Sequence, residues 1–264
     1  MSEKGEAVLY SSDSEGVAEI RFNRPERLNV LDVETARGFR DAVDRALDDE
    51  AVRVILVTAQ GKAFVAGGDL GYFRVTDDKR AAAADLIDPI HSALKRLSRS
   101  PKISLASLKG AVAGGGMSIA LNLDLAVAAD DCRFNLAYAA IGASPDCGGS
   151  WALPRLVGLR KALEIALLGE TIGAEEARRL GLVSRVVSAA ELDGETTALA
   201  TRLAKGAPIA AGHIKDLLRS SLDRTFEAQL DAEAESFAAC ASTRDFSDAV
   251  EAFFEKRKPQ FHGR

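Results

Sequence analysis

Two patterns of apolar residues alternate along the first two thirds of the chain. Short apolar runs, typical of strands buried in a sheet, are separated by stretches in which apolar residues recur every three or four positions, as on one face of a helix. The strand-like runs are 8–10, 17–22, 54–57, 103–106 and 125–128. Helices are expected after Asp32, a favoured N-cap residue type, and over about 80–98, with a further, glycine-started helix before 125. The pattern therefore predicts a mixed α/β structure in which strand, strand and helix recur.

The pattern changes after residue 187, where the strand-like runs stop. Four helices are expected beyond it, over about 189–205, 208–221, 224–239 and 245–257. The sequence thus predicts an α/β unit over 1–195 and a helical region over 196–264. Large apolar residues of the helical region fit packing either within the chain or between subunits: Phe226, Leu230, Phe237, Phe246, Phe253 and Phe254.

Composition narrows the class of protein. The chain has 264 residues, of which 47% are hydrophobic and 28% charged, enough for a sizeable core. A net charge of −5 argues against nucleic acid as the main partner. The polar start Met1–Glu6 does not resemble a secretory signal, and no apolar run approaches the roughly 20 residues of a membrane-spanning helix. We therefore expect a soluble, cytoplasmic protein without membrane contacts.

Cysteine and histidine spacing gives no sign of a disulfide framework or a metal site. The three cysteines and the three histidines are irregularly spaced and lack ligand patterns, so no metal is expected. They are Cys132, Cys147, Cys240, His91, His213 and His262.

Two glycine-rich turns are the strongest candidates for chemistry. Each follows a strand-like run and precedes a helix-like one, over 66–70 (Ala-Gly-Gly-Asp-Leu) and 113–118 (Ala-Gly-Gly-Gly-Met-Ser). Glycine lets backbone N–H groups approach a ligand with no side chain in the way. Two converging N–H groups can stabilise an oxyanion, by roughly 3–4 kcal/mol per donor. Either turn alone could simply reverse the chain, but the pair, followed by the loop 144–149, predicts an oxyanion site.

The order of the motifs resembles the enoyl-CoA hydratase/isomerase (crotonase) superfamily from about Val8 to the C-terminus. Beyond the two turns, the motifs are Asn23-Arg24-Pro25, Leu28-Asn29, Pro154–Gly158, Leu180–Val183 and Phe254–Phe261. The resemblance implies a crotonase-like spiral of ββα turns with a C-terminal helical trimerisation region. It also implies a homo-oligomer (a trimer or a dimer of trimers), an acyl-CoA thioester substrate, and no cofactor beyond the coenzyme A moiety of that substrate.

The resemblance assigns the oxyanion amides to Gly68 and Gly115. The two glutamates of the family's hydratases would fall on Ser118 and, when Phe134 and Gly142 are aligned, on Tyr138, so both acids are missing. This departure argues against simple crotonase-type hydration.

A different acid, Asp146, stands where several isomerases of the family carry their catalytic carboxylate. One carboxylate suffices for an isomerase, because it can take a proton from C2 and return it at C4. Asp146 could instead cap a helix near Ser150 or shape the turn after Pro145.

His91 borders the apolar stripe of the helix over 80–98, formed by Ile87, Ile90, Leu94 and Leu97. It is either a buried packing residue or catalytic, since it matches the histidine of the 4-chlorobenzoyl-CoA dehalogenase branch, in which Asp146 would be the nucleophile. That branch has a tryptophan in place of Tyr138. Cys147 has no evident base partner and is interpreted as a packing residue. Tyr138 and Trp151 are expected to line the acyl pocket, and Tyr138 could also orient Asp146.

Coenzyme A contacts follow from the resemblance alone. It places adenine contacts around Ala66, Asp69 and Leu70, with Arg27 or Leu28 nearby. Lys256 matches a lysine that reaches phosphate from a neighbouring subunit, and it equally fits a cation at a helix C-terminus.

The favoured hypothesis is an acyl-CoA isomerase that shifts a double bond with Asp146. The alternatives are an enoyl-CoA hydratase that uses Asp146 with ordered water, a dehalogenase-like hydrolase or thioesterase that uses Asp146 and His91, and a non-catalytic acyl-CoA-binding protein. The sequence does not specify the acyl group.

Overall fold

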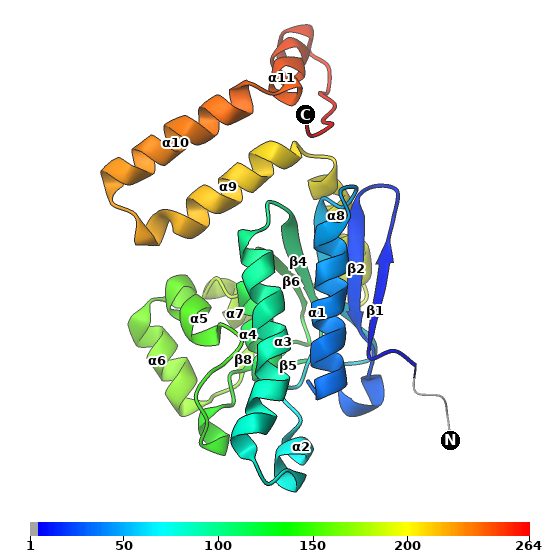
Figure 1. The fold of residues 1–264 in the computed structure, drawn as a ribbon, viewed down its shortest axis with the longest axis vertical. Coiled ribbons are helices and arrows are strands. Elements are labelled where there is room, and N and C mark those ends of the chain that lie inside the picture. Colours follow the sequence, from blue (N-terminus) through cyan, green and yellow to red (C-terminus); the bar gives the residue numbers. More distant parts are fainter. Residues whose placement is uncertain (1–4) are drawn as a thin grey trace.

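A computed structural model describes residues 5–264, and residues 1–4 of the predicted α/β unit and of the polar start lie outside that range (Figure 1). The larger of two sheets has the order β1-β2-β3-β4-β6-β9. Its strands are β1 (Val8–Ser12), β2 (Val17–Phe22), β3 (Val54–Ala59), β4 (Ile103–Leu108), β6 (Leu125–Ala129) and β9 (Arg185–Val187). Only the β1–β2 hairpin in this sheet is antiparallel. The strand-like runs of the sequence are thus confirmed.

A smaller sheet contains β5 (Ala111–Ala113), β7 (Arg133–Asn135) and β8 (Ile172–Gly173). A single bridge between Val65 and Val112 extends its pairing toward the first glycine turn. The chain passes from a strand of the larger sheet to one of the smaller sheet and then into a helix, as in β4, β5 and α4 (Gly115–Asn122). The recurring strand–strand–helix pattern is therefore present, although the short strands of the smaller sheet were not predicted.

Helices cover the larger sheet. The helix α1 (Val33–Asp48) begins as expected at Asp32, whose side chain accepts the Thr35 N–H at 2.8 Å, and it packs against α3 (Lys79–Arg99). Within α3, Ile90, Leu94 and Leu97 are buried as predicted, but Ile87 is only half-buried because it faces a cavity. The shorter helices are α2 (Leu70–Val75), α5 (Gly149–Val157), α6 (Leu159–Leu168) and α7 (Ala174–Arg179).

The four C-terminal helices are α8 (Leu192–Ala204), α9 (Pro208–Ser220), α10 (Phe226–Ala241) and α11 (Arg244–Glu255). The predicted boundary near residue 195 lies inside α8, and this helix packs on β2, β3, β4 and β6. The change in packing follows residue 204, beyond which α9, α10 and α11 extend past one end of the α/β part (Figure 1). The helix α10 buries none of its residues within this chain.

Two absences can be stated for residues 5–264. No helix there combines the length and apolar character that crossing a bilayer requires. No cluster of three or more His, Cys, Asp or Glu side chains in this part of the chain could hold a metal ion.

Candidate active site

A cavity of about 450 Å³ lies between the two glycine-rich turns, the helices α2 and α3, and the loop 137–147. Its apolar lining includes Leu31, Leu70, Phe73, Leu86, Ile87 and Ile141. Four of the five predicted catalytic residues also line it, namely Gly68, Gly115, Tyr138 and Asp146. The fifth, His91, reaches the site only through Cys147, as described below.

The two glycine-rich turns contact each other through their backbones. The Ala113 N–H donates to the Val65 carbonyl at 2.9 Å, which joins the strand before one turn to the strand before the other. Gly67 and Gly114 have positive φ, +112° and +51°. A Cβ on Gly114 would stand 3.3 Å from the Gly67 Cα. Both the conformation and the close approach therefore favour glycine.

The backbone N–H groups of Gly68 and Gly115 are the candidate oxyanion donors. On either side of Gly68, the Leu31 N–H donates to the Gly67 carbonyl at 2.8 Å and the Asp69 N–H donates to the Leu31 carbonyl at 3.0 Å. The Gly68 N–H has no acceptor among residues 5–264. Gly115 is the first residue of α4, so its N–H is one of those that a helix leaves unbonded. The helix dipole makes this end of α4 favourable for negative charge.

The Asp146 carboxylate lies beside Gly115. A Cβ on Gly115 would be 3.7 Å from Asp146 Oδ1. Asp146 is the single carboxylate among the described residues that line the cavity. It does not cap a helix with its side chain, because α5 starts after Gly148 without a side-chain cap, and its carboxylate instead accepts the Tyr138 hydroxyl. The helix-cap alternative is therefore wrong.

Tyr138 joins Asp146 to Ser118. The Ser118 and Tyr138 oxygens are 3.1 Å apart, and both residues are buried. Because the single hydroxyl hydrogen of Tyr138 goes to Asp146, Ser118 donates to Tyr138. Burial, followed by the nearby Asp146 charge, raises the pKa of Tyr138. Neutral hydroxyl groups thus stand at the two positions to which the sequence resemblance assigns the glutamates of the family's hydratases.

Cys147 follows Asp146 in a left-handed conformation, with φ +48°. Its backbone N–H donates to His91 Nε2 at 3.1 Å, and its carbonyl accepts Asn122 Nδ2 at 3.1 Å. Burial and the Asp146 charge raise the pKa of the Cys147 thiol, which keeps it protonated. A protonated, buried thiol agrees with the interpretation of Cys147 as a packing residue rather than a nucleophile.

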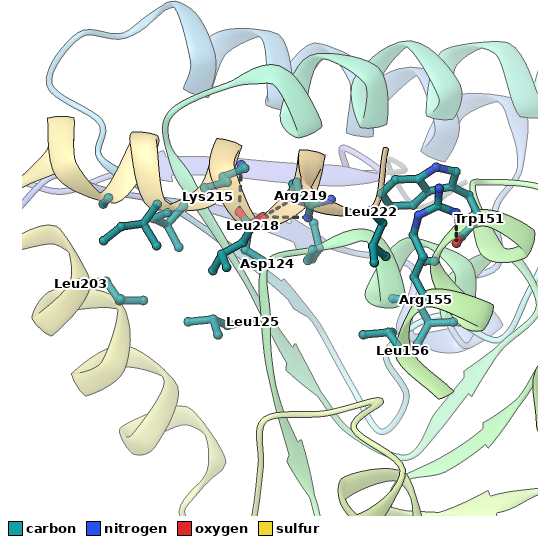
Figure 2. A pocket seen from close by; sticks show the side chains of 16 residues that line it. Asp124, Leu125, Trp151, Arg155, Leu156, Leu203, Lys215, Leu218, Arg219 and Leu222 are labelled. Atoms are coloured by element: carbon teal, nitrogen blue, oxygen red, sulfur yellow. Dashed lines mark hydrogen bonds and ion pairs between the residues drawn. The ribbon is translucent and has the colours of Figure 1, made fainter. Parts of the chain in front are cut away.

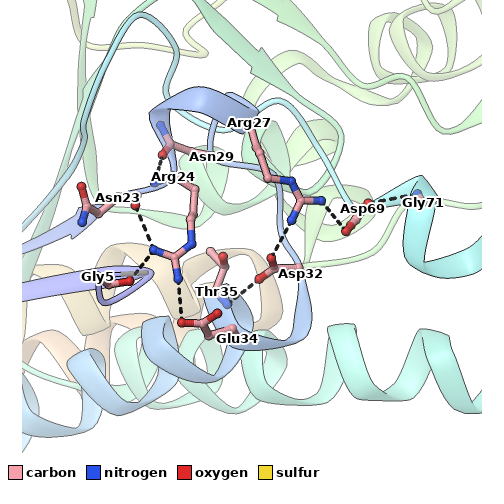
Figure 3. Close-up of polar contacts among 10 residues, drawn as sticks. All are labelled: Gly5, Asn23, Arg24, Arg27, Asn29, Asp32, Glu34, Thr35, Asp69 and Gly71. Carbon is pink, nitrogen blue, oxygen red and sulfur yellow. Dashed lines mark hydrogen bonds and ion pairs between the residues drawn. The ribbon is translucent and has the colours of Figure 1, made fainter. Parts of the chain in front are cut away.

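Arg27 links the starts of two helices (Figure 3). Its guanidinium is 3.1 Å from Asp32 and 2.6 Å from Asp69. Asp32 caps α1, while Asp69 caps α2 by accepting the Gly71 N–H at 3.0 Å. The bond to Asp69 raises the pKa of Arg27, and the Arg27 guanidinium holds the pKa of Asp69 below its ordinary value despite partial burial. Two carboxylates thus already neutralise this cation, and they fix the turn that carries Gly68.

The other residues expected to contact coenzyme A fall into two groups. Ala66 and Leu70 line the cavity, and the Leu28 carbonyl accepts the Ala66 N–H at 3.1 Å. Lys256 follows α11, at the opposite end of the molecule from α2 (Figure 1). Within one chain, therefore, Lys256 stands far from the cavity.

A second, apolar groove of about 520 Å³ lies between α5 and α9 (Figure 2). Trp151 lines this groove and not the cavity beside Asp146, so the expectation that it lines the acyl pocket is wrong. The reason is its position on α5: Gly149 faces Ser118, and Trp151 stands roughly 200° further round the helix. Its ring stacks with Arg155, whose Cζ is 4.1 Å from the ring centroid.

A partly buried ion cluster at the same groove was not predicted. Lys215 Nζ and Arg219 Nη2, one turn apart on α9, lie 2.9 Å and 2.7 Å from the Asp124 carboxylate (Figure 2). Lys215 also donates to the Leu97 and Lys102 carbonyls. Burial lowers the pKa of Lys215. The signal in the sequence was the spacing of four between two cations on one helical face.

Comparisons with known proteins agree with the motifs. The sequence model of the family described as enoyl-CoA hydratase/isomerase matches residues 12–264. The 1,2-epoxyphenylacetyl-CoA isomerase of Escherichia coli K12 is 34% identical over 260 residues, covering 97% of this chain and 98% of that enzyme. The trans-2-decenoyl-acyl-carrier-protein isomerase of Streptococcus mutans is 36% identical over 262 residues, covering 97% and 98%. An enoyl-CoA hydratase structure from Polaromonas sp. JS666 superposes with a TM-score of 0.89 at 31% identity, covering 97% of this chain and 99% of that one. The crotonase-like fold expected from the sequence is thus confirmed.

Proposed function

Because the chain belongs to the enoyl-CoA hydratase/isomerase family, we propose that it shifts a carbon–carbon double bond in an acyl-CoA thioester, with Asp146 carrying the proton. The observation that supports this choice is that Asp146 is the single carboxylate lining the described cavity, which Gly68 and Gly115 also line, and that it lies beside Gly115. A double-bond shift needs one group that both accepts and donates a proton.

The reaction balances with these groups alone. In a 3-enoyl-CoA, Asp146 removes a proton from C2, and the electron pair of that C–H bond enters the conjugated system. The resulting dienolate carries its charge on the thioester oxygen, which the Gly68 and Gly115 N–H groups stabilise. Asp146 then returns the proton at C4, so that the double bond lies between C2 and C3. No water or other reactant is consumed.

Hydration is less well supported. Adding water needs one group to deprotonate the water and another to protonate carbon. Asp146 could serve as one of them, but Tyr138 and Ser118 are neutral hydroxyls, and burial raises the pKa of Tyr138. The hydrolase alternative is also less well supported, because His91 Nε2 already accepts the Cys147 N–H and so has no lone pair for a water molecule.

We propose further that the chain works as a homo-oligomer. Large apolar side chains on α9 and α10 are exposed in the single chain, including Leu218, Phe226 and Phe237. An exposed apolar surface of this kind usually marks an interface. A neighbouring subunit would then supply Lys256 to a coenzyme A phosphate, while Ala66 and Leu70 contact the adenine.

The test compares the purified protein with its Asp146→Asn variant on 3-enoyl-, 2-enoyl- and haloaroyl-CoA substrates in deuterated buffer. We expect the 3-enoyl substrate to isomerise without net hydration, with deuterium at C4 to the extent that the proton held by Asp146 exchanges with solvent before its return. We expect the variant to lose about 10²- to 10⁴-fold in kcat. Asp41→Asn changes an exposed carboxylate on α1 and serves as the control.

Other outcomes would overturn the proposal. Net addition of water to the 2-enoyl substrate without isomerisation would favour the hydratase. Halide release would favour the hydrolase. Binding without turnover of any substrate would favour an acyl-CoA-binding protein, and full activity of Asp146→Asn would remove Asp146 from the mechanism.

A further inference from the structure

We propose that His91 is a positioning residue, which holds the peptide between Asp146 and Cys147 and thereby aims the Asp146 carboxylate at the cavity. The contact that supports this is the hydrogen bond from the Cys147 N–H to His91 Nε2, 3.1 Å long. The N–H of Cys147 belongs to the peptide that starts at the Asp146 carbonyl carbon. The direction of this N–H therefore fixes the orientation of the backbone from which the Asp146 carboxylate projects. The inference rests on the proposed role of Asp146.

The backbone conformation at Cys147 needs stabilising contacts. Cys147 has φ +48°, a conformation that residues with a Cβ rarely adopt. Three hydrogen bonds fix it: His91 accepts the Cys147 N–H, Asn122 donates to the Cys147 carbonyl at 3.1 Å, and the Gly149 N–H donates to the Asp146 carbonyl at 2.9 Å. Of these three bonds, only that of His91 comes from the helix α3.

His91 is held in place by the packed helix α3. It lies on the 21-residue helix α3 between the buried residues Ile90 and Leu94, which pack into the core. A group on a packed helix positions its partner more accurately than one on a loop. Because Nε2 accepts a hydrogen bond, the proton of the neutral ring is assigned to Nδ1. His91 therefore serves the site through its acceptor nitrogen, without touching the cavity.

This role differs from the two roles that the sequence left open. A hydrolytic base would need a free Nε2 lone pair, and a packing residue would need only the volume of the ring. A positioning acceptor needs an atom of the right kind at the position of Nε2. Glutamine offers its Oε1 at about that reach, while leucine keeps much of the volume but offers no acceptor.

The test compares His91→Gln with His91→Leu. We expect His91→Leu to lower kcat by about 5- to 10-fold, the effect of one lost hydrogen bond, with KM changed less than about 2-fold. We expect His91→Gln to retain most of the activity. In hydrogen–deuterium exchange followed by NMR, the Cys147 amide should exchange faster in His91→Leu and remain protected in His91→Gln.

Three results would overturn the inference. Full activity of His91→Leu would leave His91 a packing residue. Equal and large losses in both variants, with an aspartyl ester accumulating, would make it a base. An unchanged exchange rate of the Cys147 amide in His91→Leu would show that His91 does not hold this amide in a hydrogen bond.

The same variants in an Asp146→Asn background separate this inference from the proposed function. If His91 acts through Asp146, His91→Leu lowers the residual rate of Asp146→Asn no further. If Asp146→Asn alone keeps full activity, the proposed function fails, while amide exchange still reports whether His91 holds the loop.

Discussion

The hydroxyl of Tyr138 donates its hydrogen bond to the carboxylate of Asp146. Tyr138 in turn receives a hydrogen bond from Ser118, 3.1 Å away on α4. The carboxylate is thus held by a neutral donor whose own pKa is raised by burial. A neutral donor keeps Asp146 oriented across the pH range in which carboxylate catalysis operates, without adding a second charge to an apolar cavity.

Removing this donor should weaken catalysis. We expect Tyr138→Phe to lower kcat by about 10-fold or more, since hydrogen bonds to charged groups are worth about 1.5–3 kcal/mol. The variant also leaves the buried Ser118 hydroxyl without its partner, which should lower the free energy of unfolding by about 1–3 kcal/mol. Steady-state kinetics and denaturant unfolding measure the two effects separately.

The double variant Ser118→Ala/Tyr138→Phe is the control. It removes the unpaired hydroxyl and should recover stability but not kcat. If it recovers both, Tyr138 supports only the fold.

Gly68→Ala should fold normally and yet lose activity. A Cβ at Gly68 meets no atom within 4 Å, so the protein has room for it. Because Gly68 lines the cavity, that room is where the thioester would lie. We expect an unchanged melting temperature and a kcat/KM lowered by about 10-fold or more, as expected for a disturbed oxyanion donor.

Gly194→Ala in α8 is the matched control, because its Cβ also meets nothing within 4 Å and the site is exposed. It should raise stability by up to about 1 kcal/mol through helix propensity and leave activity unchanged. Equal activity of both variants would argue against an oxyanion donor at Gly68.

Stability should fall above pH 9 partly through Cys132. Burial, together with the neighbouring Asp131 charge, raises the pKa of the Cys132 thiol from 9.0 to about 12. Between these values the folded protein keeps a proton that the unfolded chain has released, so rising pH favours unfolding. One such proton is worth about 1.4 kcal/mol per pH unit.

The measurement is urea unfolding between pH 9 and 10.5 under reducing conditions. Cys132→Ala should show a shallower decline with pH than the parent protein, although it is less stable at neutral pH because it leaves a small void. Parallel declines would mean that the folded thiol ionises as easily as the unfolded one.

The exposed apolar residues of α10 should mediate self-association. We expect analytical ultracentrifugation to give a mass that is a multiple of the 28.0 kDa chain. Phe226→Glu, at a side chain that is 74% exposed in the single chain, should shift the distribution toward the monomer because it buries a charge in the interface. Glu235→Gln on the same helix is the control, and a monomeric parent protein would contradict the proposal.

Sequence periodicity predicted most of the scaffold. Long elements such as α3 and α9 were located within about two residues, because their apolar stripes extend over several turns. The strands β5, β7 and β8 have three residues or fewer, too short for a period to show. The boundary near residue 195 followed a change in composition, whereas the packing of α8 on the sheet depends on its buried residues Leu199 and Ala200.

In the candidate site, the two glycine turns were singled out by their residue types and Asp146 by the resemblance to the family, and all of them line one cavity. The contact between His91 and Cys147 joins residues 56 positions apart, and it depends on a left-handed backbone at a cysteine. No residue-type preference signals such a conformation. Trp151 was misplaced for a similar reason, since only the rotation of α5 decides which groove it enters.

Under the proposed function, the contact of Gly67 with Gly114 separates recognition of the thioester from the choice of reaction. The two proposed carbonyl donors follow main-chain turns that contact each other, with a would-be Gly114 Cβ 3.3 Å from the Gly67 Cα, so their spacing does not depend on the side chains at 118, 138 and 146. The side chains at 118, 138 and 146 lie around these two turns and can be replaced without changing them. If the proposed thioester carbonyl binds at these turns, a new chemistry could arise on this scaffold through a handful of point changes without loss of that binding.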